Sequence, residues 1–158
     1  MADEFLKSGI LIIGVGNPYR SDDGAGLAVI EKLKEKNLSG VEMMEAIGEG
    51  AALMDVWKGY ERVLLVDALD SGEKPGMIHR LDVQKDKIPA KFFHYSTHAF
   101  GVAEAIELAR SLNQLPRQFM VFGIQGKSFS SGTKLSKEVE RSVETVVEEI
   151  AKGVLTYA

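Results

Sequence analysis

The sequence predicts an α/β fold, a three-layer sandwich in which a mainly parallel twisted sheet lies between helices on both faces. Apolar runs of strand length alternate along the chain with segments whose apolar residues recur at helical spacing. The connections between them are short, and no repeat, linker or low-complexity tract interrupts their order. The 158 residues fit one domain, so we expect a single domain over residues 1–158.

The first two elements follow from a change of hydrophobic period. Residues 9–15 form a continuous apolar run that ends in Gly-Asn-Pro at 16–18, which predicts a buried strand followed by a turn. In the next segment Leu27, Ile30 and Leu33 share one side of a helical wheel, which predicts a helix.

The middle of the chain continues the alternation. Residues 41–46 are a second candidate strand, 51–57 a short helix and 62–68 a third strand of the buried kind. The turn-rich residues 70–76 then lead to 77–81, a short run with polar flanks that predicts an edge strand.

The last third repeats the pattern. Residues 98–112 return to helical spacing, Pro116 ends that connection, and residues 119–124 predict the last strand. Ser136 is placed to cap a final helix. The apolar face of that helix comprises Val139, Val143, Val146, Val147 and Ile150.

Composition excludes several kinds of chemistry. The chain has no Cys, which removes thiol nucleophiles, disulfides and Cys-ligated metal centres. The net charge is −4, from 19 Lys and Arg against 23 Asp and Glu, so nucleic acid is not an expected partner. Because the N-terminal residues lack a basic flank and a long apolar stretch, we expect a cytoplasmic protein with no membrane partner. A monomer is the simplest expectation.

Familiar glycine and serine motifs fail on inspection. A dinucleotide fingerprint would need a third glycine where Tyr19 stands, and a phosphate loop would need one at Val121. Ser128 lacks the closing glycine of a nucleophile elbow, and the tract 128–131 predicts a mobile loop.

Three polar residues do stand at predicted strand-to-helix junctions, namely Asp23, Asp67 and His98. Taken singly, each has an ordinary structural explanation: a helix cap, a turn contact or a bond to a backbone carbonyl. In a parallel sheet they would share one rim, where two carboxylates and an imidazole suit a divalent transition metal with open positions.

These residues lie in blocks that resemble the hydrogenase maturation endopeptidases, which trim the C-terminal tail of the large subunit of nickel–iron hydrogenases. The blocks are Gly-Val-Gly-Asn at 14–17, Ser-Asp-Asp-Gly-Ala-Gly at 21–26, Val-Asp-Ala at 66–68 and Ser-Thr-His-Ala-Phe-Gly at 96–101, with Gly123 in the last strand. The resemblance spans essentially the whole chain, and the order and spacing of the blocks make it specific.

The resemblance implies a fold, a reaction and a set of site residues. It implies a five-stranded mixed sheet with one antiparallel strand, which fits residues 77–81. It implies a peptidase of aspartic or metal-assisted type in which Asp23, Asp67 and His98 are the catalytic and metal-contacting residues. The nickel would be supplied by the partner, the hydrogenase large-subunit precursor, rather than kept as a resident ion.

On that basis water is the expected nucleophile and Asp23 the preferred base. Backbone amides near Gly48 and Gly50 are candidate oxyanion donors. Asn17 and the neighbouring glycines are expected to shape the loop.

Two alternatives stay open. The chain looks slightly like the peptidyl-tRNA hydrolases in residues 14–18, although that family continues to a histidine–asparagine pair that is absent here. A non-catalytic metal or small-ligand binding module could use the same rim.

Overall fold

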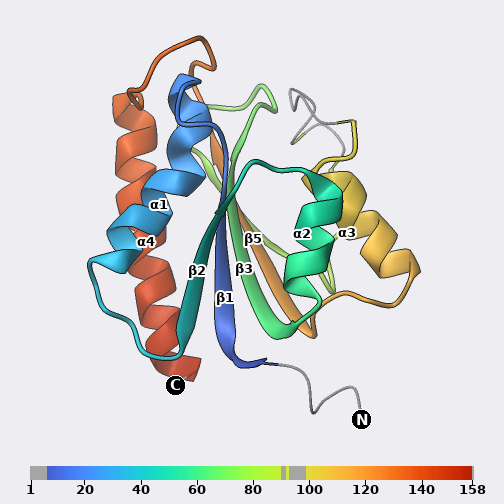
Figure 1. Ribbon diagram of the computed structural model, residues 1–158. Coiled ribbons are helices and arrows are strands. Elements are labelled where there is room, and N and C mark those ends of the chain that lie inside the picture. The colour runs from blue at the N-terminus through green and yellow to red at the C-terminus, as the bar shows by residue number, and fades with distance from the viewer. Residues whose placement is uncertain (1–6, 90–91, 93–98, 158) are drawn as a thin grey trace.

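The predicted α/β sandwich is confirmed in a computed structural model that describes residues 7–89, 92 and 99–157. One sheet lies between two layers of helices (Figure 1). In these ranges no helix combines the length and apolarity that crossing a membrane requires. The elements are β1 (Lys7–Val15), η2 (Ser21–Gly24), α1 (Ala25–Lys34), β2 (Val41–Ala46), α2 (Gly50–Trp57), β3 (Tyr60–Leu69), β4 (Ile78–Asp82), α3 (Val102–Ser111), β5 (Gln118–Gln125) and α4 (Lys137–Tyr157).

The five strands are ordered β2-β1-β3-β5-β4. The pairs β1–β2, β1–β3 and β3–β5 are parallel, while β4 runs antiparallel to β5 with Ile78 opposite Ile124. The expected antiparallel edge strand is therefore confirmed, shifted by one residue from the predicted 77–81.

The two faces of the sheet bury separate apolar layers. Helices α1 and α4 cover one face, and α2 and α3 cover the other (Figure 1). Alternate side chains of β1 serve the two layers, because Ile10 and Ile12 pack with α1 and α4 whereas Leu11 and Ile13 pack with α2 and α3. This double burial explains why the strand is a continuous apolar run.

The strand order also places the functional edge. The connection from β1 leads to α1, and the connection from β2 leads to α2 on the opposite face. Such a change of direction beside the first strand is where α/β sheets bind ligands, beyond the carboxyl ends of the strands. We therefore expect ligands to bind at the segments that follow β1 and β3.

Two local features differ from the sequence-based expectations. The predicted helix 98–112 begins only at Val102, because Gly101 has extended backbone angles and donates its N–H to the Glu104 carboxylate at 2.9 Å. Between β1 and α1 the chain forms the 3-10 turn η2, which hydrophobic periodicity did not predict.

Helix α1 approaches the sheet so closely that Gly26 admits no side chain. A Cβ at this position would lie 2.4 Å from the Val66 carbonyl oxygen and 2.5 Å from that of Val15. The contact fixes the start of α1 over the ends of β1 and β3.

Replacing Gly26 by Ala should therefore lower the free energy of unfolding by about 1–3 kcal/mol or more, because backbone must move to admit the methyl group. Urea unfolding followed by circular dichroism measures this. Gly153→Ala is the matched control, because nothing lies within 4 Å of a Cβ there and it sits inside α4. That variant should be neutral or more stable by up to about 1 kcal/mol, and equal losses in both variants would contradict the packing argument.

Candidate active site at the carboxyl edge of the sheet

Asp23 is held in η2 against the end of β1. A Cβ on Gly16 would lie 1.9 Å from the Asp23 carbonyl oxygen. The backbone at Asp23 therefore packs directly against the backbone at Gly16, with no room for a side chain there. The Asn17 N–H donates to Oδ2 of Asp23 at 3.0 Å. Asp23 is 8% exposed, so its carboxyl group is nearly buried yet borders the surface.

Asn17 also shapes the loop, as expected. Its side-chain oxygen accepts the Tyr19 N–H at 2.9 Å, and its carbonyl accepts the Arg20 N–H at 3.2 Å. These bonds form a compact turn of the kind that Asn favours. The turn aims the Asn17 N–H at Asp23.

Asp67 lies near the end of β3, opposite Gly123 of β5, and is 6% exposed. Burial raises the pKa of its carboxyl group well above the ordinary value, and the charge of Asp23 raises it further. The N–H of Ala68 donates to Oδ1 at 2.8 Å and opposes that shift. The carboxyl group of Asp67 therefore holds its proton more strongly than an exposed aspartate does.

The structure thus brings two of the three predicted site residues together. Asp23 lies in the turn after β1 and Asp67 near the end of the neighbouring parallel strand β3, and their carboxyl groups interact electrostatically. His98, the third, lies outside the described residues. Within the described ranges, no group of three or more His, Cys, Asp or Glu side chains is arranged to hold a metal ion. The three-residue site stays a prediction.

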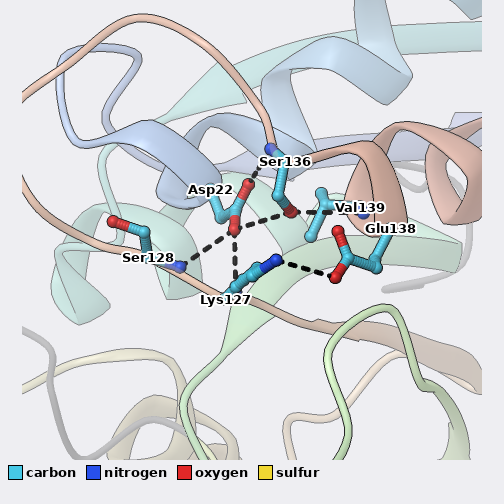
Figure 2. Close-up of polar contacts among 6 residues, drawn as sticks. All are labelled: Asp22, Lys127, Ser128, Ser136, Glu138 and Val139. Atoms are coloured by element: carbon cyan, nitrogen blue, oxygen red, sulfur yellow. Dashed lines mark hydrogen bonds and ion pairs between the residues drawn. The ribbon is translucent and has the colours of Figure 1, made fainter.

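Asp22 is a residue whose role the sequence analysis missed. A helix cap is the ordinary explanation for an acidic residue at this junction, but the N-cap of α1 is Gly24, with no side-chain cap bond. Asp22 is 1% exposed and instead binds the segment that joins β5 to α4 (Figure 2). The tract 128–131, expected to be a mobile loop, is bonded to η2, because the Ser128 N–H donates to the Asp22 carboxylate at 3.1 Å and the Ser21 hydroxyl donates to the Ser130 carbonyl at 2.8 Å.

Hydrogen bonds hold the N-terminus of α2, which follows β2, in place. The Glu49 carboxylate caps α2 by accepting the N–H groups of Ala51 and Ala52 at 3.0 and 2.9 Å. The Gly50 N–H donates to the Phe100 carbonyl at 2.8 Å. The Gly50 N–H is therefore already engaged within the protein, and the wider expectation of oxyanion donors among the amides near Gly48 and Gly50 stays a prediction.

Comparison with known proteins identifies the family. The profile of the family described as "Hydrogenase maturation protease" matches residues 27–153. The chain belongs to the hydrogenase maturation protease family. A putative hydrogenase maturation protease of Methanocaldococcus jannaschii is 31% identical over 92% of this chain and 99% of its own length. The hydrogenase 2 maturation protease of Escherichia coli is 24% identical over 89% of this chain and 87% of its own.

Solved structures agree with this assignment. The hydrogenase maturation protease HybD from Thermococcus kodakarensis superposes with a TM-score of 0.69 at 29% identity, over 92% of this chain and 99% of that one. The maturating endopeptidase HybD from Escherichia coli shares the fold, with a TM-score of 0.75 at 22% identity over 95% and 94% of the two chains. This maturation protease is thus a hydrolase of the peptidase class, and the peptidyl-tRNA hydrolase alternative is set aside.

The protonation of Asp67 gives a stability prediction for the protease. A carboxyl group whose pKa is higher in the folded than in the unfolded state stabilises the fold at acid pH, and the contribution is lost as pH rises through the folded pKa. Asp67→Asn removes the burial and repulsion of that charge. The variant should therefore be more stable than wild type at pH 8, with the difference shrinking toward pH 4.

Thermal unfolding across this pH range measures the effect. Asp55→Asn is the control, because Asp55 is an exposed partner of Lys58 at 3.1 Å and should change stability by less than about 1 kcal/mol at every pH. An Asp67→Asn variant that loses stability most at high pH would reverse the assignment.

Proposed function

We propose that the protein removes the C-terminal tail from a nickel-loaded hydrogenase large-subunit precursor, with Asp23, Asp67 and His98 at the site of reaction. The family supplies the reaction class. The observation that carries the site is the pair of nearly buried carboxyl groups of Asp23 and Asp67, in which burial and the charge of Asp23 raise the pKa of Asp67.

The pair has the electrostatics of a cation-binding edge. Two carboxylates with little solvent repel one another, and a divalent cation placed between them relieves that repulsion. Because a carboxyl group must ionise to bind a metal, the arriving nickel would displace the proton that Asp67 holds. His98 would add an imidazole ligand, in keeping with the motif around residues 96–101.

The nickel in this proposal belongs to the substrate. It fixes the precursor on the protease and orients the scissile peptide beside Asp23, which gives the reaction the advantage of a bound, aligned substrate. This recognition explains how a peptidase could act on the loaded precursor and spare the empty one. The chain's own contribution is the rigid placement of the two carboxyl groups.

Hydrolysis requires a nucleophile and a base. With no Cys in the chain, water is the nucleophile that we assign. The water oxygen bonds to the carbonyl carbon, Asp23 accepts the proton that water loses, and the proton passes to the nitrogen as the C–N bond breaks. A carboxylate has enough lone pairs to accept the Asn17 N–H and still serve a second partner.

Cleavage of the precursor should depend on Asp23 and His98. Incubation with nickel-loaded precursor should remove mass from its C-terminus, as measured by mass spectrometry. Asp23→Asn should lower the rate by about 10²-fold or more, the usual range for a lost acid–base group. His98→Ala should lower it as well, because it removes the proposed imidazole ligand of the nickel. Asp55→Asn, an exposed acid-to-amide change on α2, should keep the wild-type rate.

Full activity in both Asp23→Asn and His98→Ala would remove the site assignment. Binding of the precursor by the wild-type protein without cleavage would favour the binding-module alternative. Both outcomes can be read from one gel-shift and mass-spectrometry series.

Cleavage should also depend on the nickel that the precursor carries. Precursor prepared without nickel should be left intact, and loading it with nickel should start cleavage, because the cation places the peptide at the carboxyl pair. Precursor that carries nickel but lacks the tail should still bind, which serves as the control. Equal cleavage of loaded and empty precursor would show that nickel recognition plays no part.

A further inference from the structure

The inference concerns Asp22, which neighbours Asp23 but whose side chain contacts a different part of the protein. Its carboxylate accepts four hydrogen bonds. The donors are the N–H groups of Lys127 at 2.7 Å, Ser128 at 3.1 Å and Ser136 at 2.7 Å, and the Ser136 hydroxyl at 3.0 Å (Figure 2). All come from the segment 127–136, which joins β5 to α4.

The surroundings of this carboxylate call for a group that only accepts. Three of its four donors are backbone N–H groups, and Ser136 stands at the start of the 21-residue helix α4, where a negative charge is favoured. The Lys127 ammonium group turns away to Glu138 at 3.1 Å (Figure 2). An asparagine would place an NH₂ group against these donors, because its amide has only one accepting atom.

The same segment holds the rest of the η2 turn. The N–H groups of Ser21 and Asp22 donate to the carbonyls of Gly132 and Ser128 at 2.9 and 3.0 Å. The Ser21 hydroxyl donates to the Ser130 carbonyl at 2.8 Å. Ser21 has φ 53°, a left-handed backbone that a serine rarely adopts without such support.

We propose that Asp22 is a positioning residue for the peptidase reaction, binding the segment 127–136 so that the η2 turn directs the Asp23 carboxyl group toward Asp67. The inference rests on the proposed role of Asp23. The carboxylate of Asp22 bonds to the segment 127–136, so we assign it no contact with the reacting atoms. Its effect passes through the backbone that it shares with Asp23.

The test is the kinetics of Asp22→Asn in the full chain with nickel-loaded precursor. Misdirection of a catalytic group by its supporting shell typically costs about 10–100-fold, so kcat should fall by that factor while KM changes less than about threefold. A loss of folded protein also lowers the apparent kcat without changing KM, so each kcat is divided by the folded fraction measured by circular dichroism. A fall that remains after this correction is the effect of positioning. Glu138→Gln is the control, because it breaks the Lys127 ion pair and leaves every donor to Asp22 in place.

A folded Asp22→Asn variant with wild-type kcat would overturn the inference, as would a rise in KM alone. If Asp22→Asn does not fold, Ser136→Ala decides, because it deletes one donor to Asp22 and keeps the backbone N–H. Its folded fraction should show a lowered kcat at constant KM, and a wild-type kcat would overturn the proposal.

Failure of the proposed function is distinguishable in the same experiment. If Asp23→Asn also cleaves normally, the function assigned to Asp23 is wrong. If Asp23→Asn is inactive and Asp22→Asn is fully active, only the positioning role falls.

Discussion

The proposed site depends on two nearly buried carboxyl groups, those of Asp23 and Asp67, being held at the carboxyl edge of the sheet. Burial raises the pKa of Asp67, and the charge of Asp23 raises it further. Ionised carboxyl groups that were free to move would separate and reach solvent. The pair is therefore favoured when a proton or a cation joins it.

The protein restrains both members of this carboxyl pair. Asp67 belongs to β3, a strand with parallel neighbours on both sides, so its backbone is fixed by the sheet. Asp23 lies in a short turn and needs other restraints. The close approach of Gly16 limits one side of that turn, and the bonds of Asp22 and Ser21 to the segment 127–136 hold the other.

The sequence predicts the strands and helices because buried positions recur as apolar residues at regular spacing. Continuous apolar runs identify the parallel strands, and the helical spacing after Gly24 identifies α1. The junction positions of Asp23 and Asp67 follow from the same alternation. The short run at 77–81 with its polar flanks predicts the edge strand, and the resemblance adds that this strand is antiparallel.

The role of Asp22 could not be predicted in that way. Its partners Lys127 and Ser136 are 105 and 114 residues away, and a carboxylate beside a helix start reads locally as a cap. The donors are mostly backbone N–H groups, which have no sequence signature. The 3-10 turn could not be predicted for a related reason. Hydrogen bonds to a distant segment, rather than local preference, stabilise Ser21 in its left-handed conformation.

The long-range anchoring of the η2 turn also has a consequence for biosynthesis. The segment 127–136 is synthesised after all five strands, so the turn carrying Asp23 gains its anchor only when the C-terminal part of the chain has been made. A nascent chain that ends before β5 already contains both acids but lacks the contacts that orient one of them. The order of translation thereby makes the anchoring of this turn one of the last contacts that the growing chain can form.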